Sequence, residues 1–172
     1  MTMLAVMRHA KSSWGDESLD DFDRPLNDRG RKAARLVGRE ASKRKIDFDR
    51  VFASPALRVR QTLNSFADGY SSPLDIELEP DLYGASMGYL VERVRRIPGT
   101  VHAPLLVGHN PGLHRLALHL TKGDDPLRDR LVAKYPTGTL VLITLPAGRW
   151  DETEPGTGSI VELILPRELE GD

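Results

Sequence analysis

The sequence predicts an α/β fold, a three-layer α/β/α sandwich with a mostly parallel central sheet. Short apolar runs typical of buried strands alternate with segments of helical periodicity over most of the 172 residues. Such alternation is typical of a parallel sheet that helices cover on both faces. The length is that of one ordinary domain, so we expect residues 1–172 to form a single domain.

The first predicted strand and helix are separated by a long polar segment. Met3–Met7 is continuously apolar and stops at Arg8, which is typical of a strand buried on both faces. The polar segment Lys11–Pro25 predicts an irregular loop, and loops of this length in compact domains are often functional. Asn27 suits the amino-terminal cap of a helix that runs to about Lys45, with small and aliphatic side chains at helical spacing on its buried face.

Further strands and helices follow in alternation. Ser54 places a capping hydroxyl directly before Pro55, a residue suited to the first helical position, and Asn110 precedes Pro111 in the same way. The strands are expected at Arg50–Ala53, Leu74–Leu78 and Ala103–Val107, and the helices at Pro55–Ala67, Ser86–Arg96 and from Pro111 onward. This alternation extends the parallel sheet.

The last part of the sequence has a different pattern. Thr139–Leu145 and Ser159–Leu165 have the composition of strands, and a connection rich in glycine and proline around Trp150 joins them. No helical segment separates these two strands. They therefore predict a hairpin at one edge of the sheet.

The composition excludes several functional classes. With 24 basic and 25 acidic residues the net charge is -1, so no overall field draws the chain to nucleic acid or to an anionic membrane. The sequence has no cysteine, which excludes disulfides, thiolate metal sites and a cysteine nucleophile. It has neither a signal-peptide pattern nor a stretch of roughly 20 apolar residues. We therefore expect a cytoplasmic monomer that has no nucleic-acid or membrane partner.

Polar side chains follow three of the predicted strands. Arg8 and His9 follow the first strand, Arg58 lies in the first turn of the helix after the second, and His109 follows the strand that ends at Val107. Ligands of open α/β sheets bind outside the carboxyl ends of the strands, so we expect these side chains to converge. Two helix amino ends, two arginines and two histidines suit a dianionic phosphoryl group better than a metal or a neutral ligand.

Phosphoryl transfer requires an in-line nucleophile and stabilisation of charge on the phosphoryl oxygens. His9 is the candidate nucleophile, because neighbouring arginines favour the neutral form of its imidazole. His109 would contact phosphoryl oxygens as an imidazolium, while Arg8 and Arg58 bind the other oxygens. The sequence thus offers a candidate for each of these roles.

The proton donor and a possible metal site depend on other residues. Glu79 and Asp81, near the end of the third predicted strand, are candidates for the general acid and base. His109, His114 and His119 are spaced by five residues, which does not place them on one helical face, so we expect no zinc site.

Two aromatic residues lie in polar segments that border the candidate site. Trp14 either packs under the loop or lines the site. Tyr83 is more typical of a loop anchor than of an acid.

Six short motifs carry a resemblance to a known family. "MRHA" after a buried strand, "SPALRVRQT" at the second strand end and "VGHNPG" in the second half resemble the histidine phosphatase superfamily, which shares its fold with the phosphoglycerate mutases. "KSSW", "DFDRPLNDRG" and "DLYGAS" resemble its small bacterial branch of SixA-type phosphohistidine phosphatases. Together the motifs span almost Met1 to Leu165.

The resemblance implies a phosphoglycerate mutase-like fold and a set of site residues. It implies that His9 is phosphorylated transiently, that Arg8, Arg58 and His109 complete the catalytic core, and that Arg24 in "DRPL" reaches the substrate phosphate. It implies no metal and no cofactor. In larger members a carboxylate in a long insertion acts as the acid. This chain has little room for that insertion between residues 78 and 86, so the general acid, with Glu79 as its candidate, is the point where the resemblance is weakest.

The sequence leads to a phosphatase with a phosphohistidine enzyme intermediate. The substrate class that fits a site without a sure acid is phosphohistidine on a protein such as a histidine phosphotransfer domain, because imidazole leaves more readily than an alkoxide. The first alternative is metal-independent hydrolysis of a small phosphomonoester, a sugar phosphate or a nucleotide, which predicts an enclosed pocket and a well-placed acid. The second alternative is a phosphoprotein-binding module without turnover.

Overall fold

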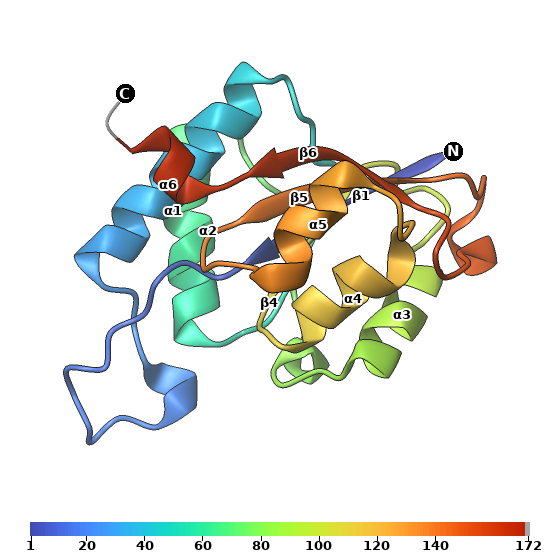
Figure 1. The fold of residues 1–172 in the computed structure, drawn as a ribbon. Helices are drawn as coiled ribbons and strands as arrows, with labels where there is room; N and C mark the ends of the chain where they lie inside the picture. The colour runs from blue at the N-terminus through green and yellow to red at the C-terminus, as the bar shows by residue number, and fades with distance from the viewer. Residues whose placement is uncertain (171–172) are drawn as a thin grey trace.

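The computed structural model describes residues 1–170, which form a central sheet with helices on both of its faces (Figure 1). The six strands have the order β3-β2-β4-β1-β5-β6. The strands are β1 (Thr2–Arg8), β2 (Arg50–Ala53), β3 (Ile76–Leu78), β4 (Pro104–Gly108), β5 (Leu140–Leu145) and β6 (Ser159–Ile164). The α-helices are α1 (Asp28–Lys43), α2 (Leu57–Tyr70), α3 (Met87–Arg95), α4 (Gly112–Leu120), α5 (Pro126–Ala133) and α6 (Pro166–Leu169). No helix in this part of the chain is both long and apolar enough to cross a membrane.

Four neighbouring strands are parallel and two are antiparallel. β3, β2, β4 and β1 run in the same direction, and β4 lies between β2 and β1. β5 runs antiparallel to β1, and β6 runs antiparallel to β5 and forms the edge of the sheet. The predicted fold class and the predicted edge hairpin are therefore both confirmed. The carboxyl ends of β1, β2 and β4 meet at the same edge.

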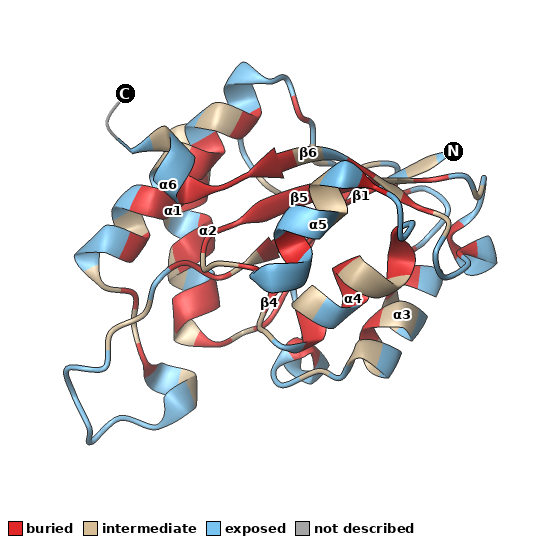
Figure 2. Ribbon diagram, in the orientation of Figure 1, coloured by how far each residue is buried: buried red, intermediate tan, exposed pale blue. Residues whose placement is uncertain are grey.

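Strand β1 separates two layers of buried side chains. Leu4 and Val6 point to one face and pack in a core that includes residues of α3, α4 and α5. Ala5 and Met7 point to the opposite face and pack with residues of α1 and α2. Figure 2 shows this burial on the strands and on the sides of the helices that face them. An apolar strand buried on both faces explains why Met3–Met7 lacks alternating polar residues.

Helix α2 begins later than predicted. Its first residue is Leu57 and its amino-terminal cap is Ala56, so the prediction that Ser54 caps a helix starting at Pro55 is wrong. The backbone N–H of Ser54 instead donates to the carbonyl of Val107 at 3.1 Å, which extends the pairing of β2 with β4 by one residue. Interstrand pairing therefore takes precedence over the local capping signal.

Helix α4 also begins one residue later than predicted, with Pro111 as its amino-terminal cap. The side chain of Asn110 still accepts a hydrogen bond from the N–H of His114 at 3.2 Å in the first turn. Helices α5 and α6 are absent from the predicted elements. α5 buries Leu131 and exposes most of its remaining residues, and α6 is four residues long, so neither has a clear apolar periodicity.

Helices α1 and α2 approach closely through two glycines. A Cβ atom on Gly38 would lie 2.1 Å from the carbonyl oxygen of Phe66, and one on Gly69 would lie 2.0 Å from that of Arg35. We expect Gly38→Ala to destabilise the fold by about 2–3 kcal/mol, because backbone must move apart in a packed interface. Chemical denaturation measures the loss. Gly99→Ala is the control, since nothing lies within 4 Å of a Cβ there and its stability should change by less than about 0.5 kcal/mol.

Candidate active site

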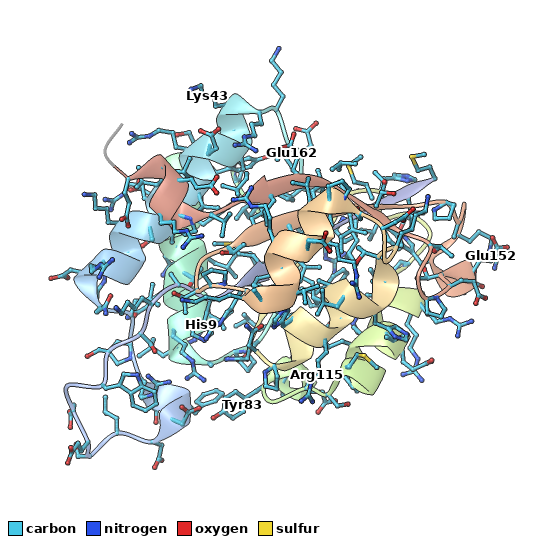
Figure 3. The ribbon with its side chains drawn as sticks, in the orientation of Figure 1. His9, Lys43, Tyr83, Arg115, Glu152 and Glu162 are labelled. Atoms are coloured by element: carbon cyan, nitrogen blue, oxygen red, sulfur yellow. The ribbon has the colours of Figure 1, made fainter. Side chains whose placement is uncertain are left out.

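A cleft of about 440 Å³ opens at the carboxyl ends of β1 and β4 and the start of α2. His9 follows β1, His109 follows β4, and Arg58 lies in the first turn of α2. Figure 3 shows His9 at the end of the sheet from which the loop of residues 11–25 extends. The residues that line the cleft are Arg8, His9, Lys11, Ser12, Trp14, Arg24, Arg58, His109, Asn110 and Thr137. The structure thus brings together five of the seven residues to which the sequence assigned a catalytic or binding role, all except Glu79 and Asp81.

His9 is held in one orientation with one ring nitrogen available. Its side chain is buried, and its Nδ1 lies 2.7 Å from the carbonyl oxygen of Ala10. A carbonyl accepts hydrogen bonds, so Nδ1 carries the proton and Nε2 has a free lone pair in the neutral ring. The pKa of His9 is lowered to about 3, chiefly by burial and also by the charges of His109, Arg58 and Arg8, against the opposing effect of the bond to Ala10. The imidazole is therefore neutral throughout the physiological pH range.

His109 lies beside His9, with ring centroids 5.3 Å apart. Its Nδ1 accepts a hydrogen bond from Nη2 of Arg58 at 3.3 Å, and its Nε2 lies 2.8 Å from Oγ of Ser54. Because Nδ1 accepts, Nε2 carries the proton of the neutral ring and donates to Ser54. Burial lowers the pKa of His109 to about 4, and the positive charge of Arg58 acts in the same direction.

Asp21 accepts hydrogen bonds from two arginines of the cleft, Arg58 and Arg24. Arg58 donates to the carbonyl oxygen of Asp21 at 2.6 Å and to its Oδ2 at 3.0 Å, and Arg24 donates to its Oδ1 at 3.1 Å. The hydroxyl of Tyr83 donates to Oδ2 at 2.6 Å. The bond from Tyr83 is the largest cause that lowers the pKa of Asp21 to about 2, and Arg58 and Arg24 add to it. Asp21 is thus ionised at neutral pH.

Arg8 and Arg24 make further contacts that fix their side chains in the cleft. Arg8 donates from Nη1 to the carbonyl oxygen of Tyr135 at 3.0 Å. Arg24 donates to Oγ of Ser12 at 2.7 Å, and its guanidinium carbon lies 3.5 Å from the centre of a Trp14 ring. Trp14 is 74% exposed, so it lines the cleft rather than packing under the loop. Arginine side chains held in this way need little reordering to bind an anion.

Two arginines of the cleft have buried donors without a protein partner. Within residues 1–170, Nε of Arg8 and Nε of Arg58 are buried and make no hydrogen bond. The cleft is lined by the cationic side chains of Arg8, Arg24, Arg58 and Lys11, and charge-assisted hydrogen bonds from arginine to an oxyanion are strong. The cleft therefore suits a tetrahedral oxyanion.

The structure does not bring Glu79 into the cleft. Arg93 donates from Nε and Nη2 to the two carboxylate oxygens of Glu79 at 2.7 and 2.8 Å. Glu79 follows β3, the edge strand farthest from β1 on that side of the sheet, and Asp81 is exposed next to it. The role of Glu79 as general acid stays a prediction.

Two residues, Asp21 and Ser54, were missed in the sequence as parts of the site, and they lie far from their partners along the chain. Asp21 is 37 residues from Arg58 and 62 residues from Tyr83. Ser54 is 55 residues from His109. The local signal for Asp21 is its place three residues before Arg24 in an acidic loop, where an ion pair is possible. No group of three or more histidine, aspartate or glutamate side chains is placed to hold a metal ion among the described residues.

The buried histidines make stability depend on pH. An unfolded histidine titrates near pH 6.5, whereas folded His9 titrates at about 3, so the unfolded chain binds more protons between these values. Stability must therefore fall as the pH falls below 6.5. For His9 alone we expect a loss of about 2 kcal/mol between pH 6.5 and 5, since one pKa unit corresponds to about 1.4 kcal/mol.

Urea denaturation of the wild type and of His9→Ala at pH 7 and pH 5 measures this effect. Between pH 7 and pH 5, the free energy of unfolding should fall by about 2 kcal/mol less in His9→Ala than in the wild type. His102→Ala, which removes an exposed histidine, should keep the wild-type pH dependence. Equal slopes for wild type and His9→Ala would contradict the expectation.

A family model and two related proteins match most of this chain at the level of sequence. The family model described as "Histidine phosphatase superfamily (branch 1)" matches residues 4–144. An uncharacterized protein of Mycobacterium tuberculosis strain H37Rv is 35% identical over 164 residues, which cover 94% of this chain and 100% of that protein. The phosphohistidine phosphatase SixA of Escherichia coli strain K12 is 29% identical over 160 residues, which cover 88% of each protein.

Solved structures agree with the sequence relatives. A structure of the protein histidine phosphatase SixA complexed with tungstate matches this chain with a TM-score of 0.79 and 25% identity, covering 98% of this chain and 100% of that one. The fold is thus the phosphoglycerate mutase-like fold that the motifs imply.

Proposed function

From the premise that this chain belongs to the histidine phosphatase superfamily, we propose that it is a phosphatase that takes the phosphoryl group of phosphohistidine on another protein onto His9. The observation that carries this proposal is the environment of His9. Its Nδ1 is engaged by the carbonyl of Ala10, and its Nε2 is free in a neutral ring beside cationic side chains. A neutral imidazole with a free lone pair is a nucleophile.

The proposed reaction has two displacements at phosphorus. Nε2 of His9 forms a bond to the phosphorus atom while the bond from phosphorus to the substrate imidazole breaks. The electron pair leaves with that imidazole, which takes a proton from water. A water molecule then attacks the phosphorus, the bond to His9 breaks, and its electron pair returns to Nε2. The proton of the attacking water passes to solvent, and inorganic phosphate leaves.

The cationic side chains supply the charge stabilisation. Arg8, Arg24 and Arg58 are in place to bind phosphoryl oxygens, and this class of interaction commonly gives the largest contribution to phosphoryl transfer. His109 is neutral without substrate, because its pKa is lowered to about 4. The negative charge of a bound phosphoryl group raises that pKa, so Nδ1 of His109 gains a proton, no longer accepts from Arg58, and donates a hydrogen bond to a phosphoryl oxygen.

The leaving group separates the proposed substrate from phosphate esters. Among the described residues that line the cleft, none carries a carboxyl group. Asp21 contacts Arg58 next to the cleft, but its pKa of about 2 leaves no proton to donate at neutral pH. An alkoxide needs such a proton as it leaves, whereas an imidazole needs it less. These observations support phosphohistidine as the substrate, and a histidine phosphotransfer domain is a protein that carries it.

Phosphate release from two substrate classes tests the proposal. The protein is incubated without metal, in chelator, with free phosphohistidine, with a histidine-phosphorylated protein and with a panel of sugar phosphates and nucleotides. We expect kcat/KM to be at least about 100-fold higher for the phosphohistidine compounds, since the esters lack a proton donor. A preference for an ester would show that this is a small-molecule phosphatase. Binding without release from any compound would show a phosphoprotein-binding module.

A further inference from the structure

A second hollow adjoins the cleft and shares part of its wall. It has a volume of about 190 Å³ and lies between the start of α1, the segment before β5 and the start of α6. Lys11 and Thr137 line both the cleft and this hollow. Helices α1 and α6 lie side by side at this place (Figure 1). The two hollows thus lie next to each other and share a wall made by Lys11 and Thr137.

The wall between the hollows is rigid because backbone contacts hold it. The carbonyl oxygen of Lys11 accepts a hydrogen bond from the N–H of Asn27 at 3.1 Å. A Cβ atom on Gly30 would lie 2.2 Å from the same oxygen, so the backbone of Lys11 packs directly against α1. The N–H of Gly138 donates to the carbonyl of His9 at 2.9 Å. Thr137 is therefore fixed next to the nucleophile, and Lys11 is fixed against the first turn of α1.

The α6 side of the hollow is fixed in the same way. Gly138 has a φ of +77°, and a Cβ there would lie 3.0 Å from Cγ of Pro166, the first residue of α6. Arg167 follows Pro166 directly and lines the hollow. A substrate that reaches Arg167 therefore meets a surface of defined shape, which lowers the ordering cost of binding.

The second hollow is rich in cations that have no carboxylate partner. Lys11, Arg29 and Arg167 line it, together with the single carboxylate of Glu170. No ion pair within residues 1–170 involves any of these three cations. By contrast, nearby Arg31 is paired with Asp28.

Arg29 is placed where the fold itself disfavours a cation. It is the second residue of α1, and the positive end of the helix dipole lies there. Its exposed side chain packs against no carboxylate in the described part of the chain. A charge that costs stability and has no internal partner suggests an external anion.

We propose that Lys11, Arg29 and Arg167, here named the basic groove, bind acidic side chains of the polypeptide that carries the phosphohistidine. This inference rests on the proposed function, because it assigns the chemistry of the substrate around the phosphoryl group. An extended or helical segment that presents its phosphohistidine to His9 places its neighbouring residues over the shared wall at Thr137. Asp or Glu side chains there face three cations. A polypeptide that carries them therefore associates faster with the protein and is bound more specifically.

Two matched substrates test the basic groove. One is a peptide with phosphohistidine flanked by Asp and Glu, and the other has Asn and Gln at the same positions. We expect the wild type to show kcat/KM about five- to tenfold higher for the acidic peptide, a preference that weakens with added salt. The double variant Arg29→Glu, Arg167→Glu should lose this preference while its activity on free phosphohistidine stays unchanged, because neither residue lines the cleft.

A second double variant controls for net charge. Arg39→Glu, Lys43→Glu introduces the same change toward the other end of α1, where helical rise places the two residues about 15 Å and about 21 Å from Arg29. Figure 3 shows Lys43 far from His9. It should keep the preference. The basic groove is ruled out if the wild type does not distinguish the two peptides, or if the groove variant and the control lose the preference equally.

A binding measurement separates this inference from the proposed function. Fluorescence anisotropy of the two labelled peptides is measured with the His9→Ala protein, with and without the groove substitutions, so no turnover is needed. Tighter binding of the acidic peptide that depends on Arg29 and Arg167 supports the groove even if no phosphoryl group is ever released. Equal binding of both peptides overturns the groove even if phosphohistidine proves to be the substrate.

Discussion

Replacing His9 with alanine is expected to lower kcat for phosphohistidine by at least about ten-thousandfold, the largest effect of any single substitution in this protein. The substitution removes the atom that forms the bond to phosphorus. No other histidine can replace it, since Nδ1 of His109 accepts from Arg58 and its Nε2 donates to Ser54. The cations would still bind the substrate, so KM should change less than kcat.

Rapid mixing with radiolabelled phosphoryl donor measures the first step directly. The wild type should form a labelled protein that survives alkali and is lost in acid, as expected of a phosphoramidate, and His9→Ala should form none. Added imidazole enters the space left by the ring and should restore part of the activity. His102→Ala, with its exposed side chain, is the matched control and should behave as the wild type. Labelling of His9→Ala at the wild-type level would contradict the assignment of the nucleophile.

The convergence of His9, Arg58 and His109 could be predicted because each follows or nearly follows a strand of one parallel sheet. Parallel strands place their carboxyl ends at one edge, so a polar residue after a strand has a known location before its contacts are known. The apolar run of Met3–Met7 indicated the strand, and its end at Arg8 indicated where chemistry begins. Periodicity and position were enough for these residues.

The strand order limited what could be said about Glu79. It also follows a strand, but β3 lies at the sheet edge, with β2 and β4 between it and β1. Its carboxylate forms two hydrogen bonds with Arg93 on α3. A sequence shows where strands end but not which strands are neighbours, so the strand-end rule could not separate Glu79 from the residues of the cleft.

The contacts of Asp21 and Ser54 could not be predicted from local sequence patterns. The sequence around Ser54 is typical of a helix cap. In the structure, however, its hydroxyl accepts a hydrogen bond from His109, and its N–H donates to the carbonyl of Val107 on the neighbouring strand. Asp21 begins a short 3-10 helix (Asp21–Asp23) within the loop of residues 11–25, and long-range contacts with Arg58 and Tyr83 hold it in place. Local propensity cannot specify such pairs, because the partners are brought together by the tertiary fold.

Replacing Arg58 with alanine is expected to lower kcat/KM by about 1000-fold, the second largest effect. Arg58 is 5% exposed and donates hydrogen bonds both to the carboxylate of Asp21 and to the ring of His109. Its loss removes a donor to the phosphoryl oxygens and also releases the loop that Asp21 holds. Arg58→Lys keeps the charge but has no planar fork for several acceptors, so a loss of about 100-fold remains.

The titration of His109 gives a second measurement that loss of structure alone would not produce. The positive charge of Arg58 helps to hold the pKa of His109 down at about 4, so that pKa must rise in Arg58→Ala and change less in Arg58→Lys. Nuclear magnetic resonance of the imidazole protons reports it in the absence of substrate. Arg60→Ala, two residues further along α2 and exposed, is the matched control for both activity and titration. A large fall in activity with an unmoved His109 pKa would mean that Arg58 acts through the loop rather than in the cleft, since the charge beside His109 would then have no measurable effect on it.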